Sequence, residues 1–366
     1  MLRPTHTVKV KNRSNPWVTR DILLLMYKRD DLHKEALKSK DPIIYTEYRK
    51  LRNKVVKEVR KAKKVYYTDQ ISQSKGTKQM WKTLRGLLKS KSKSDEFTMN
   101  PNELNNFFTN IGPSLNKNFD THSEFHWTQP DCIHTFAFDE VIEEDIYTHL
   151  SALSLDSNLD ILGMDAKLLR LGADVLVTSL SYLFNMSLKH QRIPQELKKA
   201  RVTPVYKGKG ISDDPSNYRP ISVVPHVAKI LERCVQAQFL QYLIVHKLIS
   251  CEQSAFIKYH STQTAVHKVI DDVLDNINEG FINGACFFDL TKCFDTIDHK
   301  ILLHKLERYG VRGVTLNWFT NYLADRSQVV RSHNQLSDVK AISTGVPQGS
   351  VLGPILFLIF INPFHA

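Results

Sequence analysis

A carboxylate at the end of an apolar stretch is the first candidate for chemistry. Residues 285–290 read Ala-Cys-Phe-Phe-Asp-Leu, which is typical of a buried β-strand, and Asp289 comes near its C-terminal end. A carboxylate fixed at such a point can hold a hard cation, and the backbone carbonyl of Leu290 would supply a second oxygen ligand. The alternative is an exposed strand-end aspartate that only caps the following turn.

Two further groups could bind an anion or approach a bulky ligand. Residues 345–350 read Gly-Val-Pro-Gln-Gly-Ser and precede an apolar helical stretch, so their glycines allow close backbone approach beside a helix N-terminus. Lys207 follows a short strand, and Arg219 stands in Asn-Tyr-Arg-Pro-Ile-Ser. Together this lysine and arginine could hold a triphosphate. Taken singly, the alternatives are an ordinary tight turn and surface charge.

Positive charge is concentrated at the N-terminal end of the chain. The net charge is +12, and residues 1–99 hold 26 Lys and Arg against 10 Asp and Glu, or +16, which leaves 12 − 16 = −4 for the other 267 residues. A basic arm on a mildly acidic body favours a polyanionic partner such as nucleic acid. The alternative is a solvated helix surface. The candidate contacts lie on one helical stretch: Arg49, Arg52, Lys57, Arg60, Lys61 and Lys64.

The elements that must position these groups alternate along the chain, which predicts the α/β (α+β) fold class. Apolar spacing and stop signals give the following ranges. Helices are predicted over 19–37, 45–71, 103–108, 140–155, 166–189, 227–246, 299–309 and 316–323, strands over 201–206, 285–290, 328–332 and 339–343, and a closing helix after residue 350.

Several function classes are disfavoured. The five cysteines form no Cys-x-x-Cys pair with matching histidines, so a zinc site is not expected. We expect Cys286 and Cys293 to be packed free thiols in an intracellular, nuclear or cytoplasmic protein. Residues 1–12 lack the apolar region of a secretory signal, and the apolar run 351–364 is too short to span a bilayer and is interpreted as core. The sequence gives no clear oligomer signal.

Six motifs in a fixed order point to one family. The matching residues are Phe107–Gly112, Lys199–Gly208, Asn217–Ser222, Gln253–Phe256 with His260–Thr262, Phe288–Asp295 and Gly345–Pro354. In these residues the chain resembles the reverse transcriptases of non-long-terminal-repeat (LINE-like) retrotransposons. The resemblance extends over about residues 15–362.

The resemblance implies a partial right-hand polymerase fold, with fingers and an incomplete palm, preceded by a basic helical arm. The implied divisions are 1–99 for an arm resembling the connector between endonuclease and polymerase, 100–135 for a linker, and 136–366 for the partial reverse transcriptase domain. Within this domain, 136–270 would be mainly fingers and 271–366 partial palm. The implied partners are an RNA template, a DNA primer and a deoxynucleoside triphosphate, with no membrane.

The resemblance also implies a role for each candidate site residue. Asp289, with the Leu290 carbonyl, would hold Mg²⁺ for two-metal nucleotidyl transfer. Phe294 would lie under the sugar and exclude a 2′-hydroxyl. Lys207 and Arg219 would hold the triphosphate. The turn, including Gln348 and Gly349, would line the nascent base pair; the alternative for Phe294 is core packing.

The chain departs from the family pattern in three places. Ile257 stands where the family usually has Arg, and Ala255 where it has Gly. The chain also ends at Ala366, before the family's aromatic-Ala-Asp-Asp motif. Asp295 and Asp298 are expected to point elsewhere, so we expect this chain to lack the carboxylates that two ions require.

Three functional hypotheses follow. The first is a reverse transcriptase domain that is inactive as this chain. The second is a non-catalytic module that binds RNA or an RNA–DNA hybrid. The third is an active polymerase whose remaining motif comes in trans or from a longer transcript.

Overall fold

The protein is described by a computed structural model that covers residues 15–39, 41–74, 80–81, 99–117, 132–154, 159–332 and 335–362. The chain forms two compact units, Met1–Asp95 and Glu96–Ala366, which are described separately.

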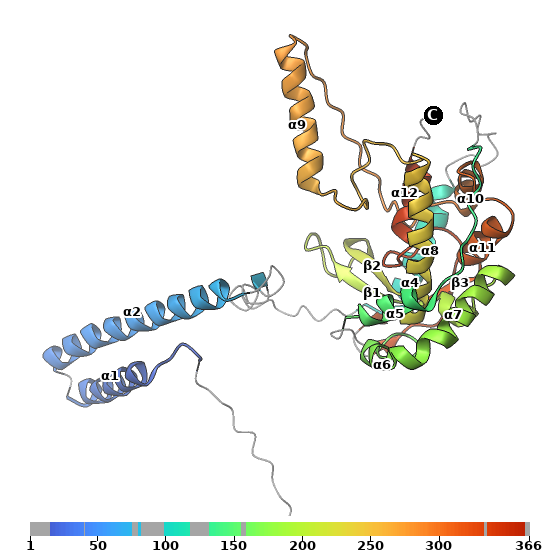
Figure 1. The fold of residues 1–366 in the computed structure, drawn as a ribbon. Coiled ribbons are helices and arrows are strands. Elements are labelled where there is room, and N and C mark those ends of the chain that lie inside the picture. The colour runs from blue at the N-terminus through green and yellow to red at the C-terminus, as the bar shows by residue number, and fades with distance from the viewer. Residues whose placement is uncertain are drawn as a thin grey trace, which may run out of the picture. The chain divides into compact units, whose positions relative to one another are not determined.

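The first unit contains two packed helices, α1 (Arg20–Ser39) and α2 (Pro42–Ser72), shown in blue in Figure 1. The turn between them ends at Asp41, whose side chain accepts a hydrogen bond of 2.8 Å from the Ile43 amide. Pro42 follows at the first helical position, where its missing N–H costs nothing. Ile22, Ala36 and Val55 are buried in the hairpin. Both helices predicted for this part are confirmed.

The second unit contains a mixed sheet among many helices. Its strands are β1 (Lys199–Tyr206), β2 (Tyr218–Val223), β3 (Arg326–Ser332), β4 (Gln335–Leu336) and β5 (Lys340–Ile342). The order is β2-β1-β3-β4, and β5 pairs with β3. β1 is antiparallel to β2 and parallel to β3, so the unit has the mixed α/β character that the sequence predicts.

The larger core lies among helices of this unit. They are α5 (Glu143–Ser151), α6 (Ala166–Leu171), α7 (Ala173–His190), α8 (His226–Val245), α10 (His299–Arg308), α11 (Val314–Leu323) and α12 (Gly353–Ile361). Phe184, Phe239, Trp318 and Phe319 are fully buried among them. The closing helix α12 is part of this core, as the interpretation of the run 351–364 predicted. No described helix is long and apolar enough to cross a membrane.

Helix α4 (Pro101–Asn116) packs on the sheet and corrects the linker predicted over 100–135. Leu104, Phe108 and Ile111 form a second core cluster with Val202 of β1 and Val330 of β3. The buried Asn105 amide donates to Ser337 Oγ at 2.9 Å. Because residues 101–116 bury apolar side chains against strands, they belong to the folded unit. Residues 118–131 of the predicted linker lie outside the described part.

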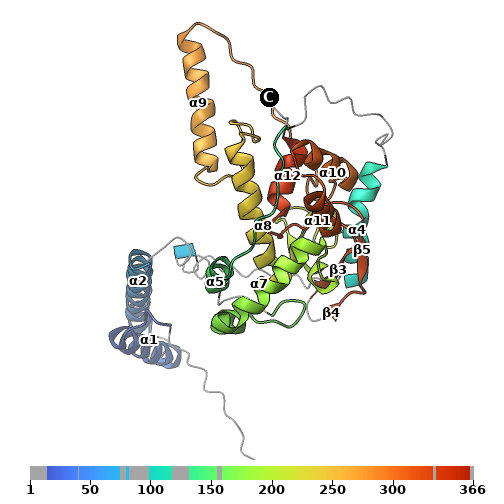
Figure 2. The same ribbon diagram turned by 45° about the vertical axis from the view of Figure 1, so that its right-hand side comes forward.

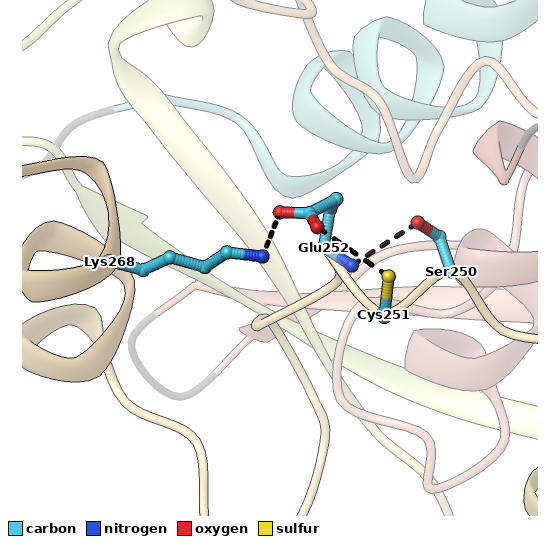
Figure 3. Close-up of polar contacts among 4 residues, drawn as sticks. All are labelled: Ser250, Cys251, Glu252 and Lys268. Atoms are coloured by element: carbon cyan, nitrogen blue, oxygen red, sulfur yellow. Dashed lines mark hydrogen bonds and ion pairs between the residues drawn. The ribbon is translucent and has the colours of Figure 1, made fainter. Parts of the chain in front are cut away.

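Helix α9 (Thr262–Asn278) stands away from the rest of the second unit in both views (Figures 1 and 2). Ser261 and Thr264 form a capping box, which explains where the helix begins. No described residue of α9 is buried. An ion pair joins Lys268 of the helix to Glu252 in the preceding loop, where the Ser250 hydroxyl accepts from the Glu252 amide (Figure 3). Hydrogen bonding to Lys268 lowers the pKa of Glu252.

Candidate functional site

One cavity collects most of the residues singled out from the sequence. It has a volume of about 340 Å³. Its wall contains Lys207, Arg219, Pro220, Asp289, Leu290, Thr291, Lys292, Cys293, Phe294, Asp295 and Gln348. The lysine–arginine pair, the candidate carboxylate and the Pro-Gln turn therefore face one space, although they come from distant parts of the sequence.

The hairpin of β1 and β2 places the two predicted cations. The Lys207 amide donates to Asn217 O at 2.8 Å, closing the hairpin just beyond the paired residues Tyr206 and Tyr218. Arg219 of β2 pairs with Val205 of β1, and the side chain of Arg219 is exposed. The Lys207 ammonium donates to Ser216 O at 2.8 Å. Antiparallel pairing thus brings both side chains to the cavity.

The turn 345–350 is held by backbone hydrogen bonds on two sides. The Ser222 amide of β2 donates to Gln348 O at 2.8 Å, and the Val346 amide donates to Phe294 O at 2.9 Å. The His299 ring donates from Nε2 to Gly345 O at 2.7 Å, and burial lowers the pKa of this histidine. Close packing against neighbouring backbone atoms requires glycine at two positions of the turn.

Gly345 has φ +80° and Gly349 φ +130°, both in the region that favours glycine. A Cβ on Gly349 would lie 2.3 Å from Ser222 O, and one on Gly345 would lie 2.7 Å from Phe294 O. The turn therefore lies directly against β2 and against the loop that follows Asp289.

A buried carboxylate, Glu232 of α8, supports the end of this turn. It accepts from the amides of Val351 and Leu352, the latter at 3.3 Å, and from the Tyr322 hydroxyl at 3.0 Å. Burial raises the pKa of Glu232, while the nearby Arg326 opposes that shift. The sequence did not predict a supporting role for Glu232 or Arg326. A single charged residue within an apolar pattern does not indicate which distant groups it contacts.

The segment carrying Asp289 corrects the prediction of a buried strand over 285–290. Residues 281–290 form no strand, and Phe287 and Phe288 are 91% and 88% exposed. Leu290 is also exposed, as is Cys286, which was expected to be packed. A strand requires a neighbour for its backbone N–H and C=O groups, and no described strand pairs with this segment.

The loop after Asp289 returns to the body through a compact turn. Lys292 has φ +55°, and its carbonyl accepts from the Asp295 amide at 2.8 Å. Asp298 ends the loop by accepting from the Lys300 amide as N-cap of α10, and it is not among the residues that line the cavity. Asp295 was also expected to point elsewhere and instead lines the cavity with Asp289.

Asp295 and Lys292 are electrostatically coupled. Burial raises the pKa of Asp295 to about 6, and the charge of Lys292 opposes this. Burial also lowers the pKa of Lys292, and the nearby Lys207 lowers it further. The cavity wall therefore holds two carboxylates and three basic side chains, and the pKa of one carboxylate, Asp295, is raised.

The donors at the cavity do not fit two divalent ions. Asp289, the Leu290 carbonyl and Asp295 are the candidate oxygens, and the described residues contain no group of three or more His, Cys, Asp or Glu side chains able to hold a metal ion. Two ions about 3.5–4 Å apart need more anionic ligands than this. The described residues therefore do not form a complete two-metal site.

The sequence supports two interpretations of Phe294, contact with the sugar and core packing, and the position of its ring is compatible with both. Its ring packs on Phe357 with centroids 4.9 Å apart and on Phe256 at 6.2 Å. The same residue lines the cavity. A ring fixed by apolar neighbours can present one face to a ligand without moving.

The six arm residues lie on α2 in the first unit, and all six are exposed. Val55 is the buried residue of α2. The Arg49 guanidinium lies 5.1 Å from the Tyr45 ring centroid. The helix thus presents its basic side chains to solvent.

Part of the second unit is similar to a known class of polymerase. Residues 205–366 match the family described as reverse transcriptase (RNA-dependent DNA polymerase). This matched range contains every residue of the cavity wall. The chain carries a reverse transcriptase domain. Residues 18–76, which contain α1 and α2, match the family described as the female sterile protein K10 C-terminal domain.

Relatives identify the kind of reverse transcriptase. The chain is 32% identical over 205 residues to the RNA-directed DNA polymerase from mobile element jockey of Drosophila melanogaster, covering 55% of this chain and 22% of the relative. It is 30% identical over 187 residues to the probable RNA-directed DNA polymerase from transposon BS of the same species, covering 50% and 20%. It is 27% identical over 184 residues to the Pol polyprotein from the type-1 retrotransposable element R2 of Popillia japonica, covering 47% and 24%.

The domain is thus of the non-long-terminal-repeat (LINE-like) retrotransposon type. The chain spans about a fifth of the length of these relatives.

Proposed function

We propose that the second unit binds the triphosphate and sugar of an incoming deoxynucleotide, as the nucleotide-binding part of an RNA-directed DNA polymerase. The observation that carries this proposal is the single cavity shared by Lys207, Arg219, Asp289 and Gln348. Arg219 offers a planar donor pair for phosphate oxygens, and Lys207 offers a point charge. Phe294 would contact the sugar, and Gln348 and Gly349 the nascent base pair.

In the same proposal the β1–β2 hairpin belongs to the fingers of a right-hand polymerase, and the region from residue 271 belongs to its palm. The template would be RNA and the primer DNA. Asp289 and Leu290 would provide part of the Mg²⁺ site. Because the described donors do not complete that site, we expect this chain to bind nucleotide without extending a primer.

Binding of dTTP to the 366-residue chain in EDTA tests the nucleotide proposal without relying on metal. The variant Arg219→Met should weaken binding about tenfold or more, because it removes hydrogen bonds to a charged group. Lys300→Met, an exposed lysine on α10 outside the cavity, is the matched control and should bind as the wild-type chain does. A folded wild-type chain that fails to bind dTTP would overturn the proposal.

Primer extension on an RNA template with Mg²⁺ tests the expectation that this chain binds nucleotide without extending a primer. We expect no extension by the wild-type chain. Extension that disappears in Asp289→Ala would show that the metal site is complete in this chain and would correct our inference about its ligands.

A second function, binding of RNA or an RNA–DNA hybrid by the arm, is favoured by the exposure of all six basic residues of α2. None of the six has an ion-pair partner in the described residues. We expect hybrid binding to weaken with salt, since each phosphate contact releases counterions. Replacing Arg52, Lys57, Arg60 and Lys61 by Gln should reduce the salt slope, while Asp289→Ala should not; an unchanged slope in the quadruple variant would exclude the arm.

A further inference from the structure

The ammonium group of Lys292 is buried and has no hydrogen-bond partner in the described structure. Its Nζ lies 5.9 Å from the centroid of the Phe107 ring, which belongs to α4. Burial of an unpaired ammonium is unfavourable, and an aromatic face compensates for only a small part of that cost. A position of this kind has an unmet requirement for a negatively charged partner.

The backbone fixes where this side chain leaves the chain. Lys292 adopts the left-handed conformation, with φ +55°, inside the turn that joins Asp289 to Asp295. Its carbonyl accepts from the Asp295 amide at 2.8 Å and from the Thr296 amide at 3.2 Å. Because two hydrogen bonds hold the turn, the backbone sets the direction of the Cα–Cβ bond of Lys292.

Lys292 lines the same cavity as Lys207 and Arg219. Three cations around one cavity repel one another, and a polyanion between them would remove that repulsion. The two lysines differ in their present partners. The Lys207 ammonium already donates to Ser216 O at 2.8 Å, whereas that of Lys292 donates to no described group.

We propose that Lys292 is a third cationic contact for the nucleotide triphosphate, beside Lys207 and Arg219. This inference rests on the proposed nucleotide-binding function and adds a residue to it. The polyphosphate supplies the acceptor oxygens that the buried ammonium lacks.

Asp295 is the competing partner within the protein. It lines the same cavity and favours the charged form of Lys292. No ion pair joins the two side chains in the described structure. If Lys292 served only to balance Asp295, its removal would affect folding and the titration of Asp295 but leave polyphosphate binding unchanged.

The test is titration of the 366-residue chain with inorganic tripolyphosphate and, separately, with dTTP, both in EDTA. Lys292→Met should raise the dissociation constant for both probes about tenfold to a hundredfold, as expected when one hydrogen bond to a charged group is lost. Lys292→Arg should retain binding within about threefold, because it keeps the charge. Lys300→Met is the control and should match the wild-type chain.

Thermal unfolding of the same variants separates binding from a structural role. Lys292→Met should unfold at the same temperature as the wild-type chain or higher, since an unpaired buried charge is removed. If wild-type binds both probes and Lys292→Met binds them equally well, Lys292 is not a phosphate contact, although the nucleotide site stands. If the folded wild-type chain binds neither probe, the proposed function fails and this inference fails with it.

Discussion

Two sides of the cavity differ in how firmly backbone contacts hold them. The cationic side is formed by the β1–β2 hairpin and the turn 345–350, and the carboxylate side by residues 281–290. The turn 345–350 is fixed to β2 by the Ser222–Gln348 hydrogen bond and to the loop after Asp289 by the Val346–Phe294 hydrogen bond. Residues 281–290, which bring Asp289 to the cavity, form no strand and are all exposed. The cationic side, with Lys207 and Arg219 on a hairpin, is preorganised for a ligand, whereas the carboxylate side depends on contacts that the described residues do not supply.

The largest effect should come from the support of the turn. Glu232→Ala removes the acceptor of the Val351 and Leu352 amides and of the Tyr322 hydroxyl, and it leaves Arg326 without its nearby carboxylate. We expect a loss of about 3–5 kcal/mol in the free energy of unfolding, measured by urea denaturation. Glu232→Gln keeps one acceptor oxygen and should cost less. A loss below about 1 kcal/mol in the alanine variant would mean that the carboxylate does not hold this turn.

The second effect depends on pH and involves Asp295. Burial raises the pKa of Asp295 to about 6 from the ordinary value of 3.8, so between about pH 4 and 6 the folded chain binds more protons than the unfolded chain. The contribution of this group is therefore present at low pH and is lost as the pH rises through about 6. A shift of this size corresponds to about 2–3 kcal/mol.

Asp295→Asn is the comparison for this titration, because it removes the ionisable group and keeps the shape. The difference in free energy of unfolding between wild-type and variant should change steadily between pH 4 and 6 and become constant above about pH 7. A difference that is independent of pH would show that the Asp295 carboxylate is solvated.

A third comparison makes the same substitution on each side of the cavity. Gly349→Ala places a Cβ 2.3 Å from Ser222 O at a φ of +130°, so it should cost about 1–3 kcal/mol. Gly284→Ala, in the exposed segment, meets no atom within 4 Å and should change stability by less than about 0.5 kcal/mol. Equal costs in urea denaturation would remove the distinction between the two sides.

The local parts of the structure could be predicted from the sequence. Helices α1, α2, α8 and α10 begin and end close to the expected residues because caps and apolar spacing are local signals. Motif order also identified the residues that meet at the cavity, including Lys207, Arg219 and Gln348. These residues are far apart in the sequence, so their meeting was implied by the family resemblance and not by periodicity.

The remaining features depend on contacts between distant residues. The linker predicted over 100–135 was wrong for residues 101–116, because only the folded sheet reveals that Leu104 and Phe108 have apolar partners. The requirement of Lys292 for an anion appears only when Phe107 and Lys207 lie around it. Strand β2 was not predicted, since Pro220 interrupts it. Helix α9 was also not predicted, although Val266, Val269 and Ile270 recur at helical spacing.

At the apolar run 285–290 the sequence predicts a buried strand and the structure shows an exposed segment. A substitution there should have the smallest effect on the free energy of unfolding. Phe288 is 88% exposed, so Phe288→Ser should change the free energy of unfolding by less than about 0.5 kcal/mol. A phenylalanine buried in a strand would instead lose about 3–5 kcal/mol on truncation. Phe184→Ala, at a fully buried position in α7, is the control that should show the larger loss. A loss of similar size for Phe288→Ser in urea denaturation would mean that this segment is covered in solution, and the carboxylate side of the cavity would then be as firmly held as the cationic side.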